Sequence, residues 1–149
     1  MANAKVDIVG LSDLPLVTDL YNQIFKPARD QEFFKRRFLG RHNDLILIAS
    51  VEERPVGFFM GFELKPNTFF AWLFGTLADY RRQGVASQLL EAVHAWAHEQ
   101  GYELIRFECH NQHRAMLHLA IDHSYDIVGM RWDSDRAANL VIFEKVLET

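Results

Sequence analysis

The stretch from Thr68 to Cys109 has the pattern of a strand, a long helix and a second strand, and this unit limits the folds open to the chain. Residues 68–78 form an apolar strand pattern, and apolar positions recur at helical spacing from residue 84 to Gly101. Residues 103–109 then alternate as in a strand. Strands joined by a helical crossover run parallel, with a right-handed connection. We therefore expect two parallel strands in the middle of the sheet.

The remaining segments predict a sheet that is otherwise antiparallel. Ser12 is expected to cap the first helix, and the turn at residues 52–55 is expected to close a hairpin. The predicted strands cover 5–11, 45–51, 56–64, 125–132 and 139–147, and the other helices cover 13–25, 33–39 and 113–123. The expected fold class is α/β (α+β), with a mixed, mostly antiparallel central sheet of about seven strands and about four flanking helices. One domain is expected over residues 1–149.

Composition excludes several classes of partner. The chain has 16 basic and 20 acidic residues, a net charge of −4 and no basic run, so no nucleic-acid partner is expected. Its apolar windows are shorter than the roughly 20 residues of a membrane-spanning helix, so no membrane is expected either. The single cysteine, Cys109, and the absence of a signal-peptide pattern in MANAKVDIVG favour the cytoplasm. A homodimer is left open.

Two arginines and a glycine stand just before the long helix, in the run DYRRQGVASQLLEAV at residues 79–93. The first N–H groups of a helix lack intrahelical acceptors and carry partial positive charge, so a loop that exposes them binds anions. Gly84 lets an anion approach closely, while Arg81 and Arg82 add charge. Ser87 adds a hydroxyl. Together, these groups suit a pyrophosphate better than a single carboxylate. The alternative is a solvated loop with an ordinary helix cap.

This run resembles the signature of the GNAT superfamily of N-acetyltransferases, Gln/Arg-x-x-Gly-x-Gly/Ala between a central strand and a helix. Arg81, Gly84 and Ala86 match it, and the resemblance extends over nearly the whole chain. It implies an acyl-CoA cosubstrate, most often acetyl-CoA, and an amine acceptor that attacks the thioester directly. It also implies that the pyrophosphate is bound by the backbone N–H groups of Arg82, Gln83, Gly84, Val85, Ala86 and Ser87.

Gly75 interrupts the apolar strand at 68–78, where a glycine marks a bulge or a close approach of another backbone. By the family resemblance, a bulge splays this strand from its parallel neighbour, and the pantetheine arm pairs with the exposed edge. Phe74, Gly75 and Thr76 are the matching positions for that contact. The alternative is that Gly75 only relieves crowding among neighbouring aromatic residues.

Catalysis requires a base for the amine, a donor for the oxyanion and a proton for the leaving thiolate. Glu108, at the end of strand 103–109, matches the position where similar enzymes have a glutamate base. A solvated carboxylate or a helix-cap partner is the alternative role of Glu108. The oxyanion donor is expected to be a backbone N–H near Gly75.

The family's next motif, Asn-x-x-Ala followed by tyrosine and Gly-Phe, is poorly kept. Counting back from Ser124 and Tyr125 puts His113 at the asparagine position, although Asn111 is only two residues away. Either residue is therefore a candidate for contact with the coenzyme. Ala120 stands where the family has its tyrosine acid, so that acid is replaced or dispensed with.

Histidines are concentrated in the same part of the chain. His113 or His110 is a candidate proton relay, while polar capping is the alternative. His113, His118 and His123 are each five residues apart, a spacing that does not place them on one helix face as metal ligands, so no metal is expected. Cys109 is expected to be inert packing.

The leading functional hypothesis is transfer of an acetyl group to an amine of a small molecule or of a protein or peptide. A catalytically weak acyl-CoA-binding sensor is the alternative, and a nucleotide-binding domain is a weaker one because no phosphate-binding glycine motif of that class occurs. The acceptor cleft is expected between the first two helices, the loop at 26–30 and the last two strands. Three acidic residues are candidates to bind a cationic amine there: Glu63, Asp133 and Asp135. The alternative is that these carboxylates face solvent.

Overall fold

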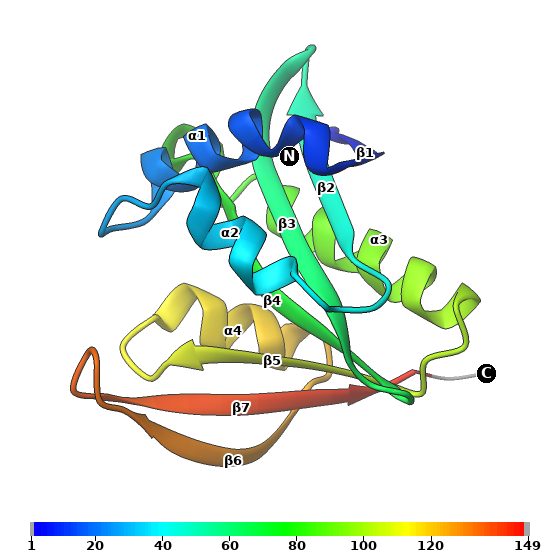
Figure 1. The fold of residues 1–149 in the computed structure, drawn as a ribbon, viewed down its shortest axis with the longest axis vertical. Coiled ribbons are helices and arrows are strands. Elements are labelled where there is room, and N and C mark those ends of the chain that lie inside the picture. The colour runs from blue at the N-terminus through cyan, green and yellow to red at the C-terminus, as the bar shows by residue number, and fades with distance from the viewer. Residues whose placement is uncertain (1, 148–149) are drawn as a thin grey trace.

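Seven strands form one sheet in the order β1-β2-β3-β4-β5-β7-β6 in the computed structural model, which describes residues 2–147 (Figure 1). Every neighbouring pair is antiparallel except β4 and β5, which are parallel. The strands are β1 (Lys5–Val9), β2 (Leu45–Val51), β3 (Arg54–Lys65), β4 (Thr68–Thr76), β5 (Leu104–His110), β6 (Asp126–Asp133) and β7 (Ala138–Val146). The predicted mixed sheet with a central parallel pair is confirmed.

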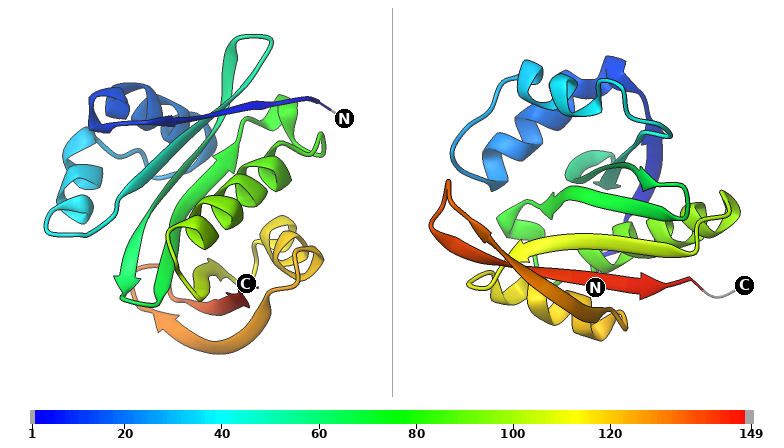
Figure 2. Two further views of the ribbon diagram at one scale, coloured as in Figure 1. Left: turned by 90° about the vertical axis from the view of Figure 1, so that its right-hand side faces the viewer. Right: turned by 60° about the horizontal axis from the view of Figure 1, so that its bottom comes forward.

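In the described part of the chain, residues 2–147, four α-helices cover the two faces of this sheet. The helices α1 (Leu14–Ile24) and α2 (Gln31–Phe38) lie on one face, and α3 (Val85–Glu99) and α4 (Arg114–Asp122) lie on the other (Figure 2). Because both faces of the middle strands are covered, these strands are continuous apolar runs rather than alternating ones. The helix α3 is the crossover that joins β4 to β5.

Aromatic side chains fill both halves of the core. On β3, Phe58 packs against Tyr21 on the α1 side of the sheet, whereas the next residue, Phe59, stacks on Phe69 at 6.4 Å between ring centroids. Phe69 in turn meets Trp96 of α3 at 4.9 Å. Successive residues of a strand point to opposite faces, so neighbouring phenylalanines stabilise the two layers separately.

The start of the first helix differs from the prediction. Ser12 lies within a 3-10 turn, Leu11–Asp13, and α1 begins at Leu14, so Ser12 is not its N-cap. Pro15 falls in the first turn of α1, where a missing N–H costs nothing, and it sets the start of the helix. Gly101 follows the end of α3 with φ of +88°, as the predicted helix stop requires.

Candidate active site

The parallel strands β4 and β5 separate soon after they begin. They pair only from Thr68 to Phe70 on β4, opposite Leu104 to Arg106 on β5. Beyond these residues β4 continues to Thr76 and β5 to His110 without pairing to each other. The predicted splay is therefore present, and it leaves the edge of β4 along Leu73–Thr76 without a pairing strand.

Gly75 is not the site of a bulge, which corrects the sequence-based expectation. Its backbone pairs regularly with Phe58 of β3, and the register slips instead at Trp72, between the pairs Met60–Leu73 and Gly61–Ala71. A Cβ on Gly75 would lie 2.9 Å from the ring of Phe25. The glycine therefore admits an aromatic side chain from the segment after α1.

A cleft of about 570 Å³ opens where the two strands part. Its floor includes Leu73 and Phe74 of β4 and residues 107–110 of β5. Its walls come from α1, the loop after it, α2, the start of α4 and the β6–β7 hairpin, which include the elements between which the acceptor cleft was expected. Further wall residues, which no local sequence pattern indicates, are Tyr21, Ile24, Phe25, Arg37, Gln112, Met116, Arg131, Arg136 and Leu140.

The loop before α3 has the geometry of an anion site. Arg82 and Gly84 both have positive φ, +63° and +82°, and Gly84 is the N-cap of α3. Residues 81–84 form a turn, and within residues 2–147 the N–H groups from Arg82 to Ser87 make no short, well-aligned hydrogen bond to a backbone or side-chain acceptor. Unpaired N–H groups that turn inward at a helix start bind phosphate oxygens, so this loop fits a pyrophosphate.

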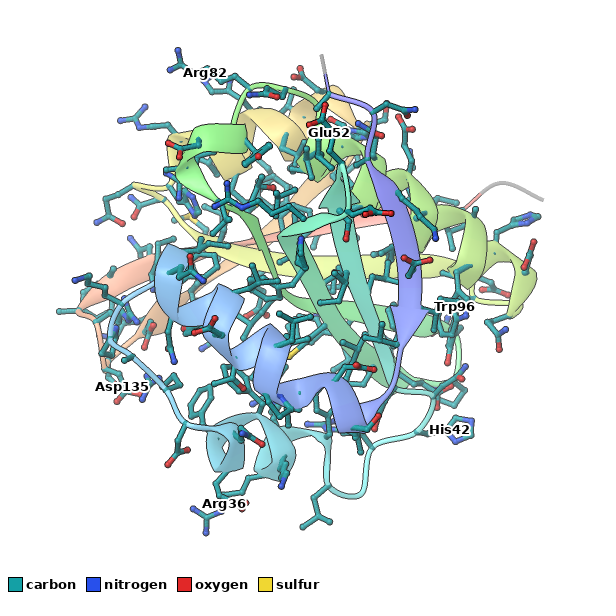
Figure 3. All side chains as sticks on the ribbon, turned by 90° about the horizontal axis from the view of Figure 1, so that it is seen from above. Arg36, His42, Glu52, Arg82, Trp96 and Asp135 are labelled. Atoms are coloured by element: carbon teal, nitrogen blue, oxygen red, sulfur yellow. The ribbon has the colours of Figure 1, made fainter. Side chains whose placement is uncertain are left out.

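The arginines of this loop differ in role. The Nε of Arg81 donates to the carbonyl oxygen of Thr76 at 3.3 Å, which ties the loop to the end of β4. Arg82 is exposed and points away from the body of the protein (Figure 3). Arg81 lines the cleft, whereas Arg82 does not. The charge of Arg82 is therefore largely solvated, and the backbone N–H groups of the loop are the main hydrogen-bond donors to a bound anion.

Other contacts fix the loop from outside. The side-chain amide of Gln88 donates to the carbonyl oxygens of Ala2 and Gly84, and its Oε1 accepts from the N–H of Ala4. The hydroxyl of Ser87 lies 3.0 Å from Nε2 of His123, just after α4. These contacts hold the N-terminal segment, the loop and α4 together. No periodic pattern in the sequence indicates such long-range contacts.

Glu108 faces the cleft but is not a solvated carboxylate, because its side chain is only 17% exposed. Arg131 of β6 contacts its Oε1 through Nε at 3.0 Å and through Nη2 at 2.9 Å. Both contacts use the same oxygen. Within residues 2–147, Oε2 has no hydrogen-bond partner.

The histidines are divided among separate contacts. His113 lines the cleft, and burial lowers its pKa, with Arg81 and His110 adding to that effect. His110 pairs with Asp133 at 3.0 Å and thereby lowers the pKa of that carboxyl. Among residues 2–147 there is no group of three His, Cys, Asp or Glu side chains that could hold a metal ion.

Two candidate positions of the poorly kept motif are clearly placed. His113 lines the cleft and Asn111 does not; the backbone N–H of Asn111 donates to Asn139. Ala120 is fully buried in α4 and offers no proton. Cys109 also lines the cleft, but burial raises the pKa of its thiol to about 11.

The acidic residues expected to receive a cationic amine are elsewhere. Glu63 accepts a hydrogen bond from Tyr102, and Asp133 is bonded by His110 and by the N–H of Asp135. None of the three carboxylates lines the cleft. That expectation is therefore wrong. The cleft is instead lined by arginines whose meeting depends on packing between distant elements.

Comparison with known proteins agrees with this geometry. The chain matches the acetyltransferase (GNAT) family over residues 14–121, and it belongs to that family. A search of curated protein sequences finds no significant match.

No helix within residues 2–147 is long and apolar enough to cross a membrane.

Solved structures share the fold at low sequence identity. The ribosomal-protein-S18-alanine N-acetyltransferase of Escherichia coli superposes with a TM-score of 0.85 at 14% identity, covering 99% of this chain and 96% of that one. Ard1 of Thermoplasma volcanium gives 0.83 at 18% identity, with 98% and 99% covered. A GNAT family acetyltransferase of Elizabethkingia anophelis with acetyl-CoA bound gives 0.82 at 14%, with 97% and 99% covered.

Proposed function

We propose that the protein transfers an acetyl group from acetyl-CoA to an amine by direct attack of the amine on the thioester. One observation carries the proposal: the unpaired edge of β4 leads to a loop whose N–H groups, from Arg82 to Ser87, make no short, well-aligned hydrogen bond within residues 2–147. Membership of the acetyltransferase (GNAT) family supports it.

Two backbone surfaces would bind acetyl-CoA. Phe74, Gly75 and Thr76 offer the open strand edge with which the pantetheine arm would pair, as an added strand does. The loop from Arg82 to Ser87 would bind the pyrophosphate. His113 is better placed than Asn111 to contact the arm, because only His113 lines the cleft.

Glu108 is the proposed general base. The amine must lose a proton as its nitrogen bonds to the carbonyl carbon of the acetyl group, and Oε2 of Glu108 would accept that proton directly or through water. Arg131 positions the carboxylate through Oε1. A backbone N–H near Gly75 would stabilise the oxyanion.

The carbon–sulfur bond then breaks, and the thiolate of CoA leaves. Ala120 has no proton to give, and a thiol with a pKa of about 11, that of Cys109, is a weak acid at neutral pH. We propose that the thiolate takes its proton from solvent. His113 is a second candidate for moving a proton at the cleft.

The buried Ala120 also supports a second candidate, an acyl-CoA-binding module with little turnover. Calorimetric titration with acetyl-CoA, together with thiol release and product mass over a panel of amines, amino acids and peptides, separates the two. Binding with acetylated product supports the transferase. Binding without transfer or thioester hydrolysis supports the binding module. Affinity for ATP or NAD but not for CoA contradicts both.

A further inference from the structure

Four cationic side chains line the acceptor end of the cleft, by which we mean the part formed by α1, α2, β6 and β7. Arg37 comes from α2, Lys26 from the loop after α1, Arg131 from β6 and Arg136 from the β6–β7 turn. Glu108 is the only carboxylate among the lining residues that the structure describes, and Arg131 already neutralises it. The molecule as a whole is acidic, with a net charge of −4, so this surplus of positive charge is local.

Arg37 is held by aromatic rings rather than by carboxylates. Its guanidinium lies 5.5 Å from the ring centroids of Phe62 and Trp72. Among residues 2–147, no carboxylate lies within 4.0 Å of Arg37, Arg136 or Lys26. Burial lowers the pKa of Arg37 most; Arg41 and Arg131 lower it further, and the negative charge of Glu108 offsets only part of that effect.

The walls of the acceptor end meet each other. Arg136 donates through Nη2 to the carbonyl oxygen of Lys26 at 3.1 Å, which joins the β6–β7 turn to the loop after α1. Figure 3 shows the turn, marked by Asp135, beside this loop. An acceptor under this contact has limited length, so the arrangement suits a small molecule better than a protein chain.

We infer that the acceptor is a small amine that also carries a carboxylate, as an amino acid does. The inference rests on the proposed function and specifies its acceptor. Arg37 and Arg136 would bind the carboxylate, since guanidinium groups match its planar geometry with paired hydrogen bonds. The amine would then lie toward Oε2 of Glu108, with the same bond changes as proposed above: nitrogen–carbon formed, carbon–sulfur broken, and the amine proton transferred to Glu108.

Amino acids and their C-terminal amides provide the test, because each pair differs in charge and hardly in size. The amide has the less basic amine, so intrinsic reactivity at neutral pH favours the amide. We expect wild-type protein to acetylate at least one acid with kcat/KM about tenfold or more above that of its amide, as one charge-assisted contact implies. Equal or better use of the amides, or preference for peptides over amino acids, overturns the inference while the proposed function stands.

Variants assign the effect to the cleft. Arg37→Gln and Arg136→Gln should each lower the acid-to-amide ratio of kcat/KM, mainly by raising KM for the acid. The matched control is Lys35→Gln, which removes a charge from the same helix outside the cleft, where Lys35 pairs with Glu32 at 3.7 Å. It should leave the ratio unchanged.

Calorimetry with acetyl-CoA tests whether Arg37 and Arg136 bind the phosphates of the coenzyme instead of the acceptor carboxylate. If Arg37→Gln and Arg136→Gln weaken acetyl-CoA binding as much as they affect the acid, the cations serve the coenzyme phosphates and the inference is wrong. An unchanged acid-to-amide ratio in both variants also overturns it. No transfer to any amine would instead contradict the proposed function itself. The wild-type comparison stands even where a variant fails to fold.

Discussion

Arg131 contacts Glu108 through one oxygen only: Nε and Nη2 of the arginine lie 3.0 and 2.9 Å from Oε1, and within residues 2–147 Oε2 has no hydrogen-bond partner. The pair joins β6 to β5 at the point where β5 has separated from β4. A carboxylate held in this way has a fixed orientation and one oxygen for proton transfer.

Glu108→Gln should therefore lower kcat by roughly 100-fold, the usual scale for loss of a general base. Its affinity for acetyl-CoA should stay within a few-fold of wild type, because the amide keeps the shape of the side chain. Steady-state kinetics and calorimetry measure the two quantities. Glu53→Gln, in the exposed turn between β2 and β3, is the control. An unchanged rate at every pH would remove Glu108 from catalysis.

His113 should control the acidic side of the pH profile if it moves the proton instead. Burial and the charge of Arg81 lower its pKa from the ordinary 6.5, so the neutral, proton-accepting ring persists to lower pH. His113→Ala should abolish the fall of kcat/KM on the acidic side, and Glu108→Gln should preserve it. Arg81→Gln removes a like charge, raises the pKa of His113 and should move that fall to higher pH. A wild-type profile in His113→Ala contradicts this role.

Gly84→Val should weaken acetyl-CoA binding by at least about tenfold, or about 1.4 kcal/mol. The valine would need φ near +82° and would place a branched side chain where phosphate oxygens approach the loop. Arg82→Ala should weaken binding less, because it removes one exposed charge. Calorimetric titration measures each affinity.

Gly101→Val is the matched control for backbone strain. Gly101 has φ of +88°, and a Cβ there would meet no atom within 4 Å. Both variants should lose stability in thermal unfolding, but only Gly84→Val should lose coenzyme affinity. Wild-type affinity in a folded Gly84→Val protein would defeat the assignment of the loop.

Gly75→Ala should destabilise the protein by about 1–3 kcal/mol, because its Cβ would lie 2.9 Å from the ring of Phe25. In a protein that already carries Phe25→Ala, the change Gly75→Ala should cost less stability than it does in wild type. Denaturant unfolding of wild type, the two single variants and the double variant measures this coupling. Additive effects would show that crowding by Phe25 is not what requires glycine.

The order of elements was predictable because both faces of the sheet are covered and the helices keep their apolar spacing. The start of α1 was not, because Pro15 competes with the capping side chain of Ser12 and sets the first turn. The register slip at Trp72 depends on cross-strand packing with β3, which no local pattern records.

The loop before α3 was predictable because its residues are consecutive, and the positive φ of Gly84 agrees with that prediction. The arginines of the acceptor end were not, because Arg37 on α2 is distant in sequence from Arg131 and Arg136 on the β6–β7 hairpin and meets them only through packing. The same reason made Glu63 and Asp133 misleading: their hydrogen-bond partners, Tyr102 and His110, lie far along the chain.

The short pairing of β4 with β5 has a consequence for how the protein responds to what it binds. Only the segment from Thr68 to Phe70 joins the two parts of the sheet by strand pairing, and the edge beyond it has backbone groups still to be paired. A molecule that pairs with that edge only in the folded state raises the melting temperature by mass action, in proportion to the logarithm of its concentration once the site is filled. The melting temperature of the protein should therefore report the concentration of the molecule that pairs with this edge.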